Sequence, residues 1–175
     1  MASKSLAQFA TWLVLALFAA TSAQAGLSLE YEMKAAYLFK FINYVDWPDL
    51  SGGTITIGVV GDNPFGDALA PLNGRKVNGR TVVVREVSSP AEWRNCQIVF
   101  ISPSEKQRYG QIIESLKGTR TLTVSEIDGF AERGGIINFV AERNKVRFEI
   151  NNAAARSKGL TISAELLKLA KIVGS

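Results

Sequence analysis

The chain has 175 residues, and 20 Lys and Arg against 16 Asp and Glu give a formal net charge of +4. Apolar types make up 47% of the chain and charged types 21%, which is typical of a folded protein and excludes a disordered one. The sequence has no His and a single Cys, Cys96. It therefore excludes a His-based catalytic triad, a Cys/His zinc site, His-ligated haem and an internal disulfide.

Residues 1–25 have the three-part pattern of a secretory signal. Lys4 gives a positive start, an apolar run covers residues 9–20, and small residues then end in an Ala-Gln-Ala tripeptide. The apolar run is shorter than the roughly 20 residues that a membrane-spanning helix needs. We expect cleavage after Ala25, export to the periplasm, and a mature chain of residues 26–175 that forms a single domain.

The mature chain alternates between helical and strand patterns for most of its length. A helix is predicted over residues 28–46, where Pro48 ends the pattern. Further helices are predicted at residues 65–72, 104–116, 127–133, 152–158 and 163–173, and strands at 54–60, 80–87, 96–102 and 121–124. A late antiparallel hairpin is predicted from residues 135–140 and 145–150, with residues 142–144 near its tip. This order predicts an α/β layered sandwich, with a mixed, mostly parallel central sheet flanked by helices on both faces.

Aromatic residues of the first predicted helix have two interpretations. Tyr37 and Phe41 recur at helical spacing, which favours a place in the core. Trp47 stands just before Pro48 at the helix end, and it is equally compatible with a core position and with a partner-binding surface. Cys96 opens the most apolar predicted strand, so we expect a buried, unreactive thiol.

Charged and apolar residues alternate along the second strand of the predicted hairpin. Lys145, Arg147 and Glu149 would share one sheet face, opposite an apolar trio. The simpler interpretation is a solvated face. The other is a polar surface for a ligand or partner, which Asn151, Asn152 and Arg156 would continue. Asn151 and Asn152 are also placed to cap the next helix.

The segment after the first predicted strand is rich in glycine. Gly58, Gly61 and Gly66 surround a strand-to-helix turn, but their spacing matches neither a P-loop nor a dinucleotide fingerprint. A tight turn that opens a helix is favoured over a phosphate site. Because open α/β sheets bind ligands at the carboxyl ends of their strands, the turn keeps three candidate ligand contacts. They are Asp62, Asn63 and Phe65.

Four stretches in this order resemble the YfiR/HmsC family of bacterial periplasmic proteins. The first three are KAAYLFKFINYVDWP at residues 34–48, IGVVGDNPFG at 57–66 and CQIVFIS at 96–102. The fourth runs with interruptions over residues 122–170. The resemblance covers nearly the whole mature chain. In one respect the chain departs from it, because well-known members carry several cysteines that form disulfides.

The resemblance implies a regulatory role rather than an enzymatic one. It implies a repressor that binds the periplasmic sensor domain of a membrane-bound diguanylate cyclase and so lowers cyclic di-GMP and biofilm formation. It also implies that an outer-membrane lipoprotein can act as a further partner, and we expect a homodimer. The alternatives are a small-molecule receptor that signals to a membrane kinase or cyclase, and a peptidoglycan-binding protein. We expect no catalytic residues, cofactor, metal or nucleic acid.

Overall fold

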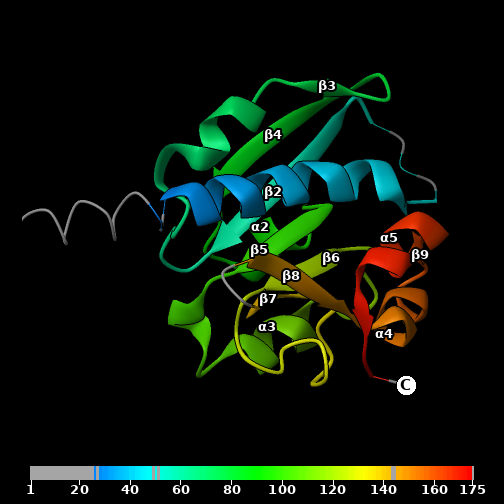
Figure 1. Cartoon of the computed structure of the whole chain (residues 1–175). Helices are drawn as coiled ribbons and strands as arrows, with labels where there is room; N and C mark the ends of the chain where they lie inside the picture. Colours follow the sequence, from blue (N-terminus) through cyan, green and yellow to red (C-terminus); the bar gives the residue numbers. More distant parts are fainter. Residues whose placement is uncertain (1–25, 27, 49, 51, 143–144, 175) are drawn as a thin grey trace, which may run out of the picture.

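The computed structural model describes residues 26, 28–48, 50, 52–142 and 145–174. Within these residues, the chain forms an eight-stranded sheet with helices on both faces and a separate two-stranded sheet (Figure 1). The expected signal segment and two residues of the expected hairpin tip, Arg143 and Asn144, lie outside the described residues.

The large sheet is mixed and mostly parallel. Its strands are β2 (Thr54–Val60), β3 (Lys76–Val77), β4 (Arg80–Glu86), β5 (Ile98–Ile101), β6 (Leu122–Ser125), β7 (Ile137–Glu142), β8 (Lys145–Ile150) and β10 (Lys171–Ile172). Their order is β10-β8-β7-β6-β5-β2-β4-β3. The five strands from β7 to β4 run parallel, whereas β7 and β8 form the predicted antiparallel hairpin. The predicted fold class is confirmed.

The chain reverses its direction of growth at β2. It first adds β4 on one side of β2 and then returns to add β5 on the other side, so Gly58 pairs with Arg85 and with Val99. The connections that leave the carboxyl ends of β2 and β5 therefore diverge. In open α/β sheets this divergence is where ligands bind.

Successive side chains of a strand point to opposite faces of the sheet. The central strands are buried on both faces because a core of packed helices covers each face. Ile98 and Phe100 face a core that includes the N-terminal helix (residues 28–44), η1 (Gly66–Leu72), α4 (Asn152–Ser157) and α5 (Ala164–Leu169). Val99 and Ile101 face a second core with α2 (Pro90–Trp93) and α3 (Tyr109–Ser115). A wholly apolar strand such as β5 is the expected sequence for this position.

The N-terminal helix packs on the β7–β8 hairpin through aromatic rings. Phe41 is fully buried, and its ring centroid lies 5.9 Å from that of Phe139 and 5.6 Å from that of Phe148. Tyr37 is half-buried, 5.3 Å from Phe148. Burying one such ring contributes about 1.5–3 kcal/mol, so these contacts anchor the helix to the sheet. The predicted core position of Phe41 is confirmed.

The predicted end of the N-terminal helix was wrong by two residues. The helix ends at residue 44, and β1 (Val45–Asp46) pairs antiparallel with β9 (Thr161–Ile162). Val45 lies opposite Ile162, and both are buried. The pairing depends on a segment more than 100 residues away, so the local pattern could not reveal it.

The C-terminal helix was also predicted too long. α5 ends at Leu169, and β10 pairs in parallel with β8, after which the Val173 N–H donates to the Ile150 carbonyl at 3.0 Å. The pairing satisfies backbone groups at the edge of β8 that would otherwise need other partners.

The helix predicted over residues 104–116 is in fact two short helices. η2 (Pro103–Glu105) and α3 are separated at Arg108, whose φ of −126° is not helical. Arg108 forms an ion pair with Glu105 across this break. Residues 127–133, predicted as a turn of helix, form a series of turns, and η1 is a 3-10 helix.

Candidate functional site

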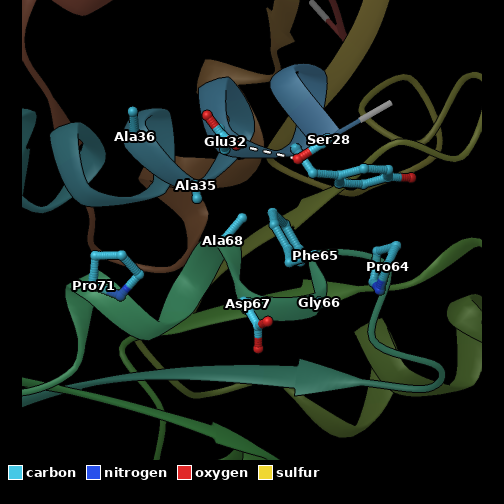
Figure 2. Close-up of a pocket in the computed structure, with 11 residues that line it drawn as sticks. Ser28, Glu32, Ala35, Ala36, Pro64, Phe65, Gly66, Asp67, Ala68 and Pro71 are labelled. Atoms are coloured by element: carbon cyan, nitrogen blue, oxygen red, sulfur yellow. Dashed lines mark hydrogen bonds between the residues drawn. The ribbon is translucent and has the colours of Figure 1, made fainter. Parts of the chain in front are cut away.

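A cleft of about 790 Å³ lies between the start of the N-terminal helix and η1. The helix contributes residues spaced three or four apart, which share one side of a helix. These are Ser28, Tyr31, Glu32, Ala35 and Ala36, and the other wall consists of residues 64–68 and Pro71. Figure 2 shows Ala35 on the helix facing Ala68 and Phe65 on the opposite wall. The small side chains of Ala35 and Ala68 leave space between the two walls.

Phe65 is fixed in the cleft wall by its own turn and by its ring contacts. Its backbone N–H donates to the side-chain oxygen of Asn63 at 3.0 Å. Its ring packs edge-on against Phe100 at 4.7 Å and against Tyr31 at 5.4 Å. Edge-to-face ring pairs of this kind favour one geometry. The wall is therefore preorganised.

A buried ionic cluster fixes the helix wall to the sheet. Lys34 is only 4% exposed, and its Nζ contacts a carboxylate oxygen of Glu126, which directly follows β6, and lies 2.5 Å from Oε1 of Glu30. The Tyr31 hydroxyl donates to the other Glu126 oxygen at 2.8 Å. Burial, together with the neighbouring Glu126 carboxylate, raises the pKa of Tyr31 well above its usual range. Tyr31 thus remains a protonated donor at neutral pH.

The three candidate residues of the strand-to-helix turn have different positions. Phe65 is buried and lines the cleft, whereas Asp62 and Asn63 are exposed. The Asp62 N–H donates to Oγ of Ser104 at 2.9 Å, and the Asn63 side-chain amide donates to Glu86 at 3.2 Å. Because side chains of the protein already accept from the N–H groups of Asp62 and Phe65, the geometry favours a tight turn over a phosphate cradle.

Gly61 has a steric role in this turn. Its φ is +86°, and a Cβ atom added there would lie 2.4 Å from Oγ of Ser104. The turn therefore requires glycine both for its backbone conformation and for the close approach of the loop after β5.

The polar face predicted on β8 is interrupted. Lys145 and Arg147 are exposed as expected, but Glu149 is buried at 8% exposure. β10 pairs along this edge, and Nζ of Lys171 donates to Oε1 of Glu149 at 2.8 Å. The ion pair raises the pKa of Lys171. The expectation of an exposed Glu149 was wrong because β10 was not predicted.

Asn151 and its neighbours form the start of α4. Asn151 is buried, accepts from the Ala154 N–H at 2.8 Å and donates to the Ala131 carbonyl at 2.8 Å. The capping role proposed for Asn151 is confirmed. Asn152 is the half-buried first residue of α4, and Arg156 is exposed further along the helix.

Trp47 is only 8% exposed and belongs to the core beneath the N-terminal helix. Its indole N–H has no acceptor within the described part of the chain. Trp47 follows the end of that helix, whereas the cleft lies along its first half, residues 28–36. It lines a different pocket, with Arg94, Arg120 and Lys158 among the other residues.

The structure does not unite the predicted site residues into one site. Phe65 lies in the cleft, Trp47 at the far end of the helix, and the β8 and α4 residues form a third region. Sequence reasoning missed Lys34 and Glu126 because 92 positions separate them. Tyr31 and Ala35 lie four residues apart, a spacing that puts both on one side of the helix and so on the same wall of the cleft.

Within the described residues, no three or more Cys, Asp or Glu side chains come together in a way that could hold a metal ion. No helix in these ranges combines the length and apolar character needed to cross a lipid bilayer.

Comparison with known proteins identifies a family and several similar solved structures. The family model described as YfiR/HmsC-like (DUF4154) matches residues 31–171. A conserved domain protein from Vibrio cholerae O1 biovar El Tor is 13% identical, with a TM-score of 0.56 over 82% of this chain and 60% of its own. The ABC domain in complex with L-Trp from Streptococcus pneumonia is 15% identical, with a TM-score of 0.49 over 68% of this chain and 55% of its own.

The chain thus spans somewhat more than half the length of either solved structure. At these identities, the likeness to the Vibrio protein concerns the fold alone.

Proposed function

Because this chain belongs to the YfiR/HmsC-like family, we propose that it is a periplasmic repressor of a membrane-bound diguanylate cyclase. It binds the periplasmic sensor domain of the cyclase and holds the enzyme inactive. Cyclic di-GMP and biofilm formation fall as a result. The observation that carries the proposal is the family match over residues 31–171. This family is regulatory and periplasmic, and its members act with a partner protein.

The proposed contact surface is the exposed face of the N-terminal helix beside the cleft. Leu29 and Met33 are 59% and 39% exposed and lie one helical turn apart. They adjoin Glu32 and Ala36 of the cleft wall on the helix surface. Met is enriched at protein interfaces, and a few well-buried residues at the centre of an interface supply most of its binding free energy. The helix is held by its buried cluster, so this face is presented rigidly.

Groups with shifted pKa values support a structural rather than a catalytic role in the proposal. Tyr31 is a hydrogen-bond donor within the buried cluster. Burial raises the pKa of the Cys96 thiol, which lies in the second core. Neither shift generates a nucleophile or a base at neutral pH.

We also propose that the chain is processed by signal cleavage and assembles with itself and with a second partner. The signal segment is cleaved after Ala25, and residues 26–175 act in the periplasm as one domain. The repressor is a homodimer, and an outer-membrane lipoprotein or peptidoglycan is a second partner. Lys145, Arg147 and Arg156 are exposed charges available to such a partner.

Binding of the cyclase sensor domain tests the contact surface. We expect the purified protein to retain the sensor domain in a pull-down, and the double variant Leu29→Glu/Met33→Glu to lose it. Two charges at the centre of the apolar face would be desolvated without partners. Gln111→Glu, an exposed position on α3, is the control and should bind normally. Equal retention of both variants would place the contact elsewhere.

A small-molecule receptor is the second candidate function, and the cleft itself favours it. Its volume of about 790 Å³ is within the usual range of ligand sites, and Tyr31 and Phe65 line it. A thermal-shift screen with amino acids and nucleotides separates the two candidates. A ligand at 100 times its Kd stabilises the protein by about 2.7 kcal/mol. Stabilisation that is lost in Ala68→Leu, which places a larger side chain in the partly exposed cleft wall, would favour the receptor.

A further inference from the structure

A second pocket, of about 640 Å³, has three basic side chains among its described lining residues. Arg94 ends α2, Arg120 precedes β6, and Lys158 ends α4. All three line the pocket, and the described lining residues include no Asp or Glu. The remaining described lining consists of Trp47, Pro48, Leu50, Gly118, Thr119, Ser157 and Gly159.

Two of the cations are held in place by the end of α3. The Arg94 guanidinium contacts the Ser115 carbonyl, and Nζ of Lys158 donates to the Leu116 carbonyl at 2.8 Å. Cations are favoured at the negative end of a helix, where carbonyl groups lack helical partners. α3 therefore orients both side chains before any ligand arrives.

Both side chains keep donors for a ligand. A guanidinium has five N–H donors and an ammonium has three. The hydrogen bonds of Arg94 all use Nη1, and that of Lys158 uses one donor of its Nζ. Within the described residues, neither forms an ion pair with a carboxylate.

Lys158 is affected both by burial and by the positive charge of Arg94. Burial and the nearby Arg94 charge lower the pKa of Lys158. Trp47, which lines the pocket, has a buried indole N–H with no acceptor in the described part of the chain. An anion in the pocket would relieve the repulsion between the cations.

We propose that this pocket binds the oxyanion group of a small molecule, either a phosphate or a carboxylate. Arg94 and Lys158 donate charge-assisted hydrogen bonds to the oxyanion. Trp47 and Leu50 contact the apolar part of the ligand. The pocket lies at the opposite end of the N-terminal helix from the proposed partner surface, so this site is distinct from that surface.

Calorimetric titration of the purified protein tests the site. The probes are inorganic phosphate and succinate, each at an ionic strength held constant with sodium chloride. We expect at least one probe to bind, and the stronger one identifies the class of anion. Arg94→Gln and Lys158→Met should each weaken that binding about tenfold or more, as expected for loss of a charged hydrogen bond. Lys158→Arg should retain it.

The matched control is Lys168→Met, which removes the same charge from an exposed position on α5 outside the pocket. It should bind like the unmodified protein. Arg94 has an exposed side chain, so Arg94→Gln should fold normally even if Lys158→Met does not. No binding of either probe, or equal weakening in Lys168→Met and Arg94→Gln, would overturn the proposal. Neither result bears on repression, which is measured through cyclic di-GMP.

Discussion

Lys34 carries a buried positive charge between two carboxylates, Glu30 and Glu126. Lys34→Met removes that charge and leaves both carboxylates without their cation. We expect the free energy of unfolding to fall by about 3 kcal/mol, as is usual when one partner of a buried ion pair is deleted. Urea unfolding measures the loss. Lys106→Met, at an exposed position, should change the stability by less than about 0.5 kcal/mol. A similar small change in Lys34→Met would mean that the cluster contributes little.

Cys96 is 2% exposed, and burial raises the pKa of its thiol. Both effects keep the reactive thiolate scarce at neutral pH. We expect a disulfide reagent such as DTNB to label the native protein far more slowly than the urea-unfolded protein at pH 8. The labelling time course, read by absorbance, tests this. Equal rates in the two states would show that the thiol is accessible.

The sequence predicted some residue positions and missed others for a physical reason. Phe41 and Asn151 were placed correctly because helical spacing and capping are local properties. Glu149 was misplaced because its burial depends on β10, which was taken for helix. Trp47 had two interpretations, and its burial follows from packing beneath the N-terminal helix.

Among the elements, α2 depends on a capping interaction that can be tested. The Glu92 carboxylate accepts from the N–H groups of Ser88 and Ser89, each at 2.9 Å, and from the Ser89 hydroxyl at 2.8 Å. These bonds lower the pKa of Glu92 from 4.5 to about 2. A depressed pKa contributes stability that is fully present above pH 4.5 and is lost as the pH falls towards 2.

Glu92→Gln should therefore lower the Tm at pH 7, and the difference from the unmodified protein should shrink between pH 4.5 and pH 2. Thermal unfolding across this pH range measures it. Glu132→Gln, exposed in a turn, is the control and should show no such pH dependence. A Tm difference that stays constant with pH would contradict the capping account.

The elements that the sequence predicted well are the long ones. β2 and β8 match their predicted ranges because their patterns are strong over six or seven residues. The short strands β1, β9 and β10 were missed, since two residues carry no periodic signal and form only against a distant partner. The cleft could not be predicted for the same reason, because its two walls come from different segments of the chain.

At the scale of the whole molecule, the proposed partner surface and the pocket around Arg94 and Lys158 lie towards opposite ends of the N-terminal helix. The apolar face formed by Leu29 and Met33 is attached to the sheet through the Lys34 cluster and the Phe41 contacts. The proposed repression requires this face. The pocket around Arg94 and Lys158, at the other end of the N-terminal helix, is the proposed site for the oxyanion ligand.

Intracellular cyclic di-GMP in a strain that lacks this protein tests the repression most directly. We predict that cyclic di-GMP rises on deletion. It should return to normal when the unmodified protein or Gln111→Glu is supplied, and stay high with Leu29→Glu/Met33→Glu, provided that the three proteins reach equal levels. No rise on deletion under several growth conditions would contradict repression of a cyclase.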